Sequence, residues 1–230
     1  MKREEYKREE YKRDLWQEYV ENADYIERVW KEGVIDFGEN FLNGNVTFLY
    51  EVYQAFIDQE RFRIDEQRGI EYEKDQDLYF IRYQGEEWSF EYKPMKELLE
   101  RSIGIFEDML PLGSVVDLKK EFLQKGSETE LPDTIRMVIV QRYVGESPEG
   151  FYYPYAGAVY PIGNPGNTKL LEFTPALIQT VVSRGYSDEQ EEAYQYLMKQ
   201  EIFLHRGLHS MGFADEEERR AYQKFVERRG

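Results

Sequence analysis

Glu201, His205 and His209 are the residues whose types and spacing come closest to a reactive site. They follow one another at four-residue intervals, so one continuous helix would place all three side chains on the same face. Two histidines four residues apart is the arrangement that zinc-binding helices use. The intervening sequence lacks the glutamate of the His-Glu-x-x-His motif, however, and Gly207 weakens a helix. Ordinary surface or packing histidines are therefore favoured, and a metal-dependent enzyme is an alternative.

Other catalytic patterns are missing from the sequence. Ser114 follows a glycine but has no Gly-x-Ser-x-Gly elbow, and the two histidines are far from it along the chain. The glycines at 163 and 166 are not followed by the Lys-Ser/Thr of a phosphate loop. The acidic runs 188–192 and 215–218 begin predicted helices, where negative charge is favourable. We therefore expect a non-enzymatic protein without a cofactor.

The composition narrows the class of partner. The chain has 230 residues, no cysteine and a formal net charge of −16, so disulfides and cysteine nucleophiles are excluded. Excess carboxylates disfavour binding to nucleic-acid phosphates and favour an electropositive partner. An acidic nucleic-acid mimic is a further alternative, suggested by charge alone. No apolar run approaches the ~20 residues of a spanning helix, and residues 1–14 do not resemble a secretory signal. We expect a cytoplasmic protein without membrane insertion.

An aromatic segment is the best candidate for a protein-binding surface. Tyrosine is enriched at binding hot spots because it covers a large area at low entropic cost. Packing in a β-sheet core is the alternative for the same residues. The predicted partner-binding residues are Phe151, Tyr152, Tyr153, Tyr155 and Tyr160.

Hydrophobic periodicity predicts an α+β fold, with antiparallel sheet elements flanked by helices, a long N-terminal helix and a helical C-terminus. Helices are predicted over 3–31, 46–58 (capped by Asn45), from Pro94 to Leu110-Pro111, from Thr174-Pro175 to Gly185, from Ser187 to Gly212, and from Ala214 onward. Strands are predicted over 61–65, 78–83, 88–92, 114–118, 136–144, 151–160 and 170–173, and a polar excursion over 119–133.

Changes along the chain in charge, hydrophobic periodicity and turn residues predict four segments. These are a charged N-terminal helix (1–33), an α+β part with an aromatic hairpin (34–107), a β-rich domain (108–194) and C-terminal helices (195–230). The main change lies near Asp108, where turn and strand patterns replace the helical periodicity.

Five motifs in order lie within the third segment: Leu110–Val116, Met137–Val140, Tyr155–Gly157, Tyr160–Gly163 and Gly185-Tyr186. In this order they resemble a family of small proteins of unknown function encoded in type VII secretion loci of Gram-positive bacteria. The resemblance covers about residues 108–194. Two features depart from the family pattern: the linker between the first two strands is longer and more acidic, and the N-terminal half lies outside it.

The resemblance implies a genomic context more than a chemistry. Such loci export toxins with an N-terminal LXG-type helical domain and encode escorts and immunity proteins for them. We therefore expect a protein-binding accessory that acts by direct complex formation with a toxin or secretion component. The escort and immunity roles, and the oligomeric state, remain open at this point.

Overall fold

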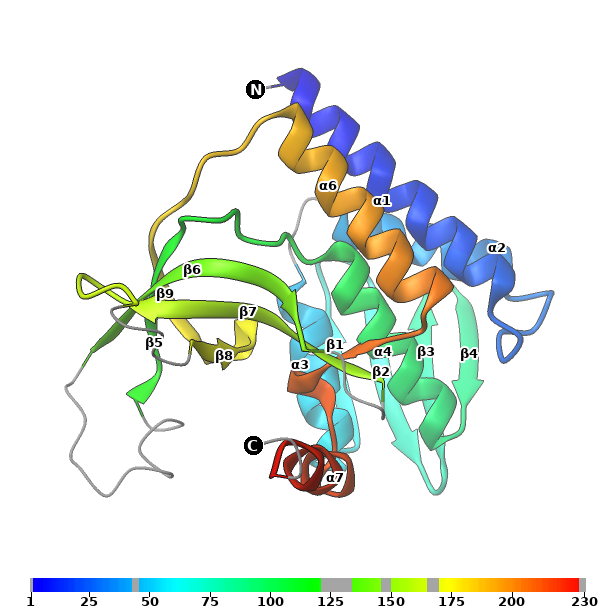
Figure 1. Cartoon of the computed structure of the whole chain (residues 1–230). Helices are drawn as coiled ribbons and strands as arrows, with labels where there is room; N and C mark the ends of the chain where they lie inside the picture. The colour runs from blue at the N-terminus through cyan, green and yellow to red at the C-terminus, as the bar shows by residue number, and fades with distance from the viewer. Residues whose placement is uncertain (1, 43–45, 121–133, 146–149, 165–169, 228–230) are drawn as a thin grey trace. The chain divides into compact units, whose positions relative to one another are not determined.

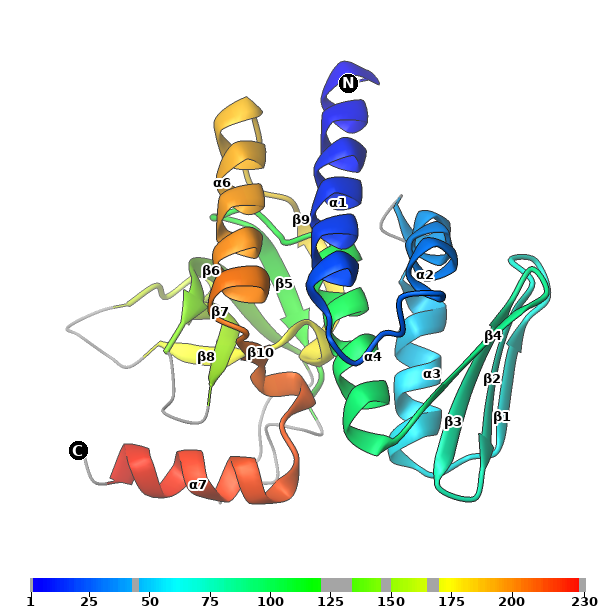
Figure 2. The same cartoon turned by 90° about the vertical axis from the view of Figure 1, so that its right-hand side faces the viewer.

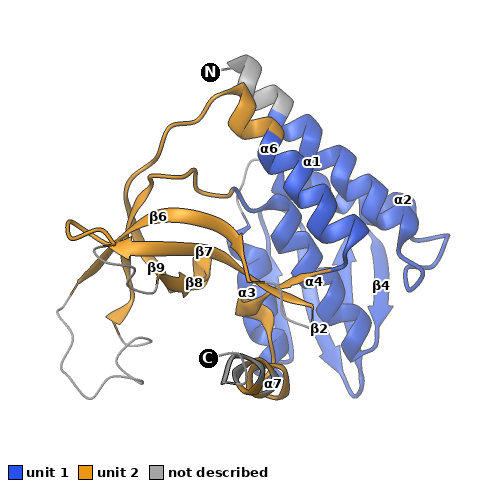
Figure 3. Cartoon of the chain, viewed as in Figure 1, with its two compact units in different colours: residues 1–108, 194–207 blue, residues 109–193, 208–230 orange. Residues whose placement is uncertain are grey.

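The computed structural model describes residues 2–42, 46–120, 134–145, 150–164 and 170–227. The chain forms two compact units, which Figure 3 shows in different colours. Unit 1 contains residues 1–108 and 194–207, and unit 2 contains residues 109–193 and 208–230. Each unit combines helices with a mainly antiparallel sheet, which confirms the predicted α+β class. Residues 195–230, predicted as one helical segment, divide between the units after Gly207.

Unit 1 contains the helices α1 (Lys2–Asn22), α2 (Lys31–Gly38), the 3-10 turn η1 (Glu39–Phe41), α3 (Thr47–Ile57) and α4 (Tyr92–Phe106). Three of these, α1, α3 and α4, were predicted from apolar periodicity, whereas α2 and η1 were not. Pro94 is the third residue of α4 rather than its first, which is tolerated because the first-turn N–H groups have no helical acceptor. The predicted cap Asn45 lies outside the described residues.

The first helix ends earlier than predicted. It stops at Asn22 instead of continuing to Lys31, and the Asn22 side-chain amide donates to the Glu18 carbonyl at 2.8 Å. Lys31 Nζ reaches back to the Glu21 carbonyl at 2.6 Å. Asparagine competes with helical backbone bonding, and a cation favours a helix C-terminus. These side chains therefore terminate a helix that apolar spacing alone would extend.

Unit 1 has a four-stranded antiparallel sheet in the order β1-β2-β3-β4. The strands are β1 (Phe62–Asp65), β2 (Ile70–Asp75), β3 (Leu78–Tyr83) and β4 (Glu86–Phe90). The predicted aromatic hairpin is confirmed, but its second strand spans Glu86–Phe90 instead of 88–92. Tyr83 lies opposite Glu86, so the turn is the two residues Gln84-Gly85 rather than the predicted loop 84–87. Both turn residues have positive φ, as the right-handed twist of a hairpin requires. Figure 2 shows α3 and α4 on one side of this sheet.

The core of unit 1 is aromatic. Trp16 is fully buried and donates its indole N–H to the Val34 carbonyl at 3.0 Å. Phe106 packs against Trp16 with ring centroids 5.3 Å apart, and Trp88 packs against Phe37 at 5.8 Å. The core therefore joins α1, α2, α4 and the inner face of the sheet.

Unit 2 is built on a six-stranded sheet in the order β10-β7-β6-β5-β9, with β8 paired to β7. The strands are β5 (Val115–Leu118), β6 (Ile135–Val144), β7 (Phe151–Val159), β8 (Leu171–Phe173), β9 (Ile178–Ser183) and β10 (His209–Ser210). Figure 1 shows β6 and β7 as the long central strands. All pairs are antiparallel except β10 with β7. The predicted strands of this region are confirmed; β9 and β10 were not predicted.

Strand β9 corrects a predicted helix. The segment after Thr174 forms only the 3-10 turn η3 (Pro175–Leu177) and then continues as β9, which pairs with β5. Thr180, Val181 and Val182 are β-branched and favour extended backbone. The free edge of β5 supplies the hydrogen-bond partners, so tertiary pairing outweighs the helix-start signal.

The last helices begin close to their predicted positions. Helix α6 (Glu189–Lys199) starts in unit 2, and its cap is Asp188 rather than the predicted Ser187. Asp188 Oδ1 accepts from the N–H groups of Gln190 and Glu191, both at 3.0 Å. The helix continues in unit 1 as a π-helical stretch, η4 (Gln200–His205). Unit 2 then adds the 3-10 turn η5 (Met211–Phe213) and α7 (Glu216–Glu227).

Candidate binding surface

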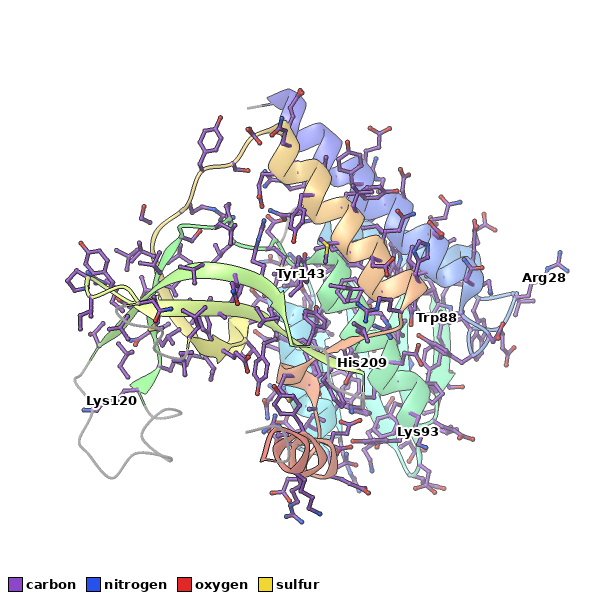
Figure 4. The ribbon with its side chains drawn as sticks, in the orientation of Figure 1. Arg28, Trp88, Lys93, Lys120, Tyr143 and His209 are labelled. Atoms are coloured by element: carbon purple, nitrogen blue, oxygen red, sulfur yellow. The ribbon has the colours of Figure 1, made fainter. Side chains whose placement is uncertain are left out.

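The three candidate metal ligands do not share a helix face. His205 and Glu201 form an exposed pair on η4, with His205 Nδ1 3.2 Å from Glu201 Oε2. The helix ends there because Gly207 adopts a left-handed conformation with φ of +59°. His209, labelled in Figure 4, instead belongs to β10. There it pairs with Phe151 of β7. The prediction that one helix aligns all three is therefore wrong.

The described residues contain no group of three or more His, Asp or Glu side chains that could hold a metal ion. Unit 1 does contain an open cleft of about 500 Å³ beside the Glu201–His205 pair, between the end of α1, α4 and residues 203–207. Buried Arg101 lines this cleft and donates to the Gly207 carbonyl at 2.8 Å. Through this bond the Arg101 guanidinium on α4 holds the chain in place just after η4.

The aromatic segment predicted to bind a partner is largely inside unit 2. Phe151, Tyr152 and Tyr155 are buried, whereas Tyr153 is half-buried and Tyr160 is 50% exposed. Burial excludes the first three from a surface in the folded state, which corrects their predicted role. The core-packing alternative describes them correctly.

Tyr155 shows how the aromatic segment contributes to the core of unit 2. Its ring packs with Phe173 at a centroid distance of 5.5 Å, within a cluster that also contains Val116 and Ile139. Its hydroxyl accepts a hydrogen bond from the Leu110 N–H at 2.9 Å. The ring thus fills the core while its polar tip satisfies a buried backbone donor.

What remains exposed is the turn after β7, defined here as the Tyr160 turn (Val159, Tyr160 and Ile162). Their exposed fractions are 43%, 50% and 69%. The Tyr160 N–H donates to the Arg136 carbonyl at 2.9 Å, and the Gly163 N–H donates to the Val159 carbonyl at 2.8 Å. The turn is therefore held by its backbone while it presents large apolar side chains outward.

Arg136, which the sequence did not single out, lies beside the Tyr160 turn. It is on β6 opposite Asp117 of β5, and its guanidinium makes two bonds to that carboxylate at 2.7 and 2.9 Å. The bonds to Asp117 raise the pKa of Arg136 and lower the pKa of Asp117. The period-two alternation of 135–144 could have placed Arg136 on the face opposite buried Met137.

Residues of the motifs on which the sequence resemblance rests have structural roles. Ser114 is fully buried, and its hydroxyl donates to the Pro111 carbonyl at 2.7 Å. The same oxygen accepts from the Gly185 N–H at 2.9 Å. The first and the last motif are thereby joined through one side chain. Within unit 2, these residues of the motifs therefore have packing and hydrogen-bonding roles.

The stretch that contains these motifs corresponds to a known domain. Residues 109–194 match the family model of a domain of unknown function, DUF4176. The DUF4176 domain therefore supplies most of unit 2, including β5 to β9 and the Tyr160 turn. No curated protein and no solved structure matches the chain. Among the described helices, none is long and apolar enough to cross a membrane.

Unit 1 contains a second group of chemically notable residues, a buried ionic cluster at the end of α4. Lys199 Nζ donates to the carbonyls of Ile105 and Glu107 at 2.7 and 2.5 Å. Lys12 Nζ lies 2.8 Å from Asp108 Oδ1. Lys199 thus caps the C-terminus of α4, where positive charge is favourable. Lys12 instead pairs with Asp108 and donates to the Leu42 carbonyl at 3.1 Å.

Burial perturbs the ionisation of this cluster. Desolvation lowers the pKa of Lys199 to about 7 and raises the pKa of Glu107 to about 7. The Tyr50 hydroxyl donates to Glu107 Oε1 at 2.9 Å, which opposes the rise. Desolvation also lowers the pKa of Lys12. Perturbed pKa values occur at structural networks as well as at active sites, and here Lys199 caps a helix while Lys12 pairs with Asp108.

Proposed function

We propose that the chain is a non-enzymatic protein-binding accessory that acts by forming a direct complex with a protein partner through the Tyr160 turn. The carrying observation is the exposure of Val159, Tyr160 and Ile162 on a backbone-bonded turn. Arg136 beside them is held in place by Asp117. Tyrosine and arginine are among the residues enriched at binding hot spots, and a pre-ordered surface binds at a lower entropic cost.

The proposed partner is a toxin or secretion component of a type VII secretion locus with LXG toxins. The ordered motifs between Leu110 and Tyr186 support this context through their resemblance to proteins of such loci. The match of the same stretch to the DUF4176 domain supports treating it as one evolutionary module. The domain carries no assigned activity, and the buried role of Ser114 is consistent with a binding rather than a catalytic use.

Escort and immunity are the two forms of this role, and they differ in which part of the toxin is bound. An immunity protein would occlude a basic active site, and the net charge of −16 would accelerate that encounter at low salt. An escort would bind the helical N-terminal domain of the toxin. Co-purification of the full chain with proteins encoded beside its gene separates the two, provided toxin fragments are tested individually.

The surface itself is tested with a double variant. Tyr160→Ala with Ile162→Ser should weaken partner binding at least tenfold, because it removes two large exposed anchors. The matched control is Tyr186→Ala, which removes a tyrosine of unit 2 that is 80% exposed. Equal affinities for the double variant and the control would reject the Tyr160 turn. Failure of all neighbouring gene products to bind would reject the proposed function.

A further inference from the structure

The four-stranded sheet of unit 1 has an outer face that the helices do not cover. The register places Tyr72, Ile81 and Trp88 in one buried row on the inner face. Side chains alternate along a strand, so the neighbouring positions point to the opposite side. Figure 2 shows α3 and α4 on the inner side and no described helix of unit 1 on the other.

Large apolar side chains lie on this outer face. Phe62 and Ile64 of β1 are 49% and 45% exposed, and Leu78 of β3 is 41% exposed. An antiparallel sheet with one solvated face usually carries polar side chains there. These apolar side chains, two on β1 and one at the start of β3, lie on either side of β2 and are unexplained by the folding of unit 1.

Strand β2, between β1 and β3, carries a row of acidic side chains on the same face. Glu71, Glu73 and Asp75 alternate along β2 and point to the outer face. Arg82 of β3 is 2.5 Å from Glu73 and 3.9 Å from Glu71, and it also pairs with Glu87 of β4 at 2.6 Å. Arg82 therefore pairs with three carboxylates, and Asp75, opposite Leu78, adds a fourth negative charge to the same face. The outer face keeps a negative surplus.

The dimensions of the face fit a helix. Carboxylates two residues apart on a strand are separated by ~6.6 Å along it. Residues four apart on a helix rise by ~6 Å. Strands β1 and β3 are two strand spacings apart, ~10 Å, which is about the diameter of a helix.

We propose that the outer face of the β1–β4 sheet binds a basic amphipathic helix of a protein partner. The helix lies along β2, with Lys or Arg at every fourth position over Glu71, Glu73 and Asp75. Apolar side chains on its two flanks contact Phe62 and Ile64 on one side and Leu78 on the other. This surface goes beyond the proposed function, because it lies in unit 1 and recognises a different kind of segment from the Tyr160 turn.

The test uses the full-length protein and a synthetic probe. The probe is an 18-residue fluorescent helical peptide of Leu, Ala and Lys, with Lys at positions i, i+4, i+8 and i+12 flanked by Leu. Fluorescence anisotropy should show saturable binding that weakens as salt is raised, because exposed charges are screened. A peptide of the same composition with scrambled Lys positions should bind at least tenfold more weakly. Absence of saturable binding, or equal binding of both peptides, would overturn the proposal.

A matched pair of variants locates the surface. Glu71→Gln/Glu73→Gln/Asp75→Asn should weaken peptide binding at least tenfold. Glu27→Gln/Asp36→Asn/Glu51→Gln removes the same three charges from other exposed positions of unit 1 and should change it less than twofold. Similar losses in both variants would show attraction by net charge only and would contradict the proposal.

Further measurements separate a loss of binding from unfolding of the variant. They also keep the result for this surface independent of the result for the Tyr160 turn. Asp75→Lys leaves the Arg82 pairs intact and should by itself weaken binding, and peptide binding should slow amide exchange in β1 and β2. Exchange protection elsewhere, with none in these strands, would overturn the assignment. Tyr160→Ala/Ile162→Ser should bind the peptide like the native protein, so the two surfaces succeed or fail separately.

Discussion

Ser114 and Gly185 are 71 residues apart in the chain and are joined by a 2.9 Å hydrogen bond from the Gly185 N–H to the Ser114 Oγ. The contact joins residues near the two ends of the stretch 109–194, which matches the DUF4176 family model. A Cβ at Gly185 would collide with the Leu112 carbonyl oxygen, so only glycine allows this approach. The pair explains two family-like motifs by packing rather than by catalysis.

Gly185→Ala should destabilise unit 2 by about 3 kcal/mol, because backbone must move to admit the methyl group. Ser114→Ala should cost about 1–2 kcal/mol through the loss of two hydrogen bonds at a buried site. Hydrogen exchange of the β5 and β9 amides measures both effects. Ser183→Ala on exposed β9 is the control and should change stability by less than ~0.5 kcal/mol. A Ser114→Ala protein with native exchange rates would show that the bridge is dispensable.

Gly104→Ala should destabilise unit 1, although replacing glycine by alanine within a helix usually stabilises a protein. In an ordinary helix this change stabilises by about 1 kcal/mol. Here a Cβ would lie 2.6 Å from the ring of Phe203, which is buried on the returning helix. We expect faster amide exchange over residues 194–207 and lower stability of unit 1.

The control for this prediction is Lys93→Ala, at an exposed position of the same helix (Figure 4). It should be neutral within ~0.5 kcal/mol. Unchanged or slower exchange in Gly104→Ala would mean that Phe203 moves aside without cost.

The stability of unit 1 should depend on pH through Lys199. Because its pKa falls from 10.5 to about 7 on folding, the unfolded state binds more protons between these values. Stability should therefore rise with pH across that window, and Lys199→Met should flatten the rise. Urea unfolding followed by tryptophan fluorescence measures it, since Trp16, Trp30 and Trp88 all belong to unit 1. An unchanged slope would contradict the burial of the Lys199 ammonium.

Glu107 should make the stability of unit 1 fall as pH rises, over a lower pH range than Lys199. Its pKa rises from 4.5 to about 7 on folding, so the folded state binds more protons between these values. The associated stability is present below pH 4.5 and is lost as pH rises toward 7. Glu107→Gln should remove this loss, while Glu27→Gln, at an exposed position, should leave it intact. A pH profile of Glu107→Gln identical to the native one would refute the assignment.

Two arginine pairs of unit 2 should differ strongly in importance. Arg142 bonds both carboxylate oxygens of Glu191, and their side chains are 4% and 14% exposed. Arg142→Ala leaves a buried carboxylate without this partner and should cost about 3 kcal/mol. Arg220, 72% exposed, pairs with Glu216 at 2.9 Å, and Arg220→Ala should cost less than ~0.5 kcal/mol. Equal effects in thermal unfolding would contradict the difference in burial.

Local signals in the sequence determined most secondary structure. The aromatic alternation on either side of residues 84–87 predicts the β3–β4 hairpin, because a glycine-containing loop between two alternating segments is a local turn signal. The α+β class follows in the same way, since apolar periods of two and 3.6 alternate along the chain. The absence of cysteine excludes disulfide and thiolate chemistry without any structure.

The tertiary structure alone decided where long-range partners overrule these signals. Residues 178–183 become β9 because β5 offers a free edge, and Tyr155 becomes core because Leu110 and Phe173 surround it. His209 leaves the face of Glu201 and His205 because Gly207 ends the helix and β7 pairs with the next segment. Such outcomes depend on contacts between residues far apart in the chain, whereas helix and turn signals depend on neighbours within a few residues.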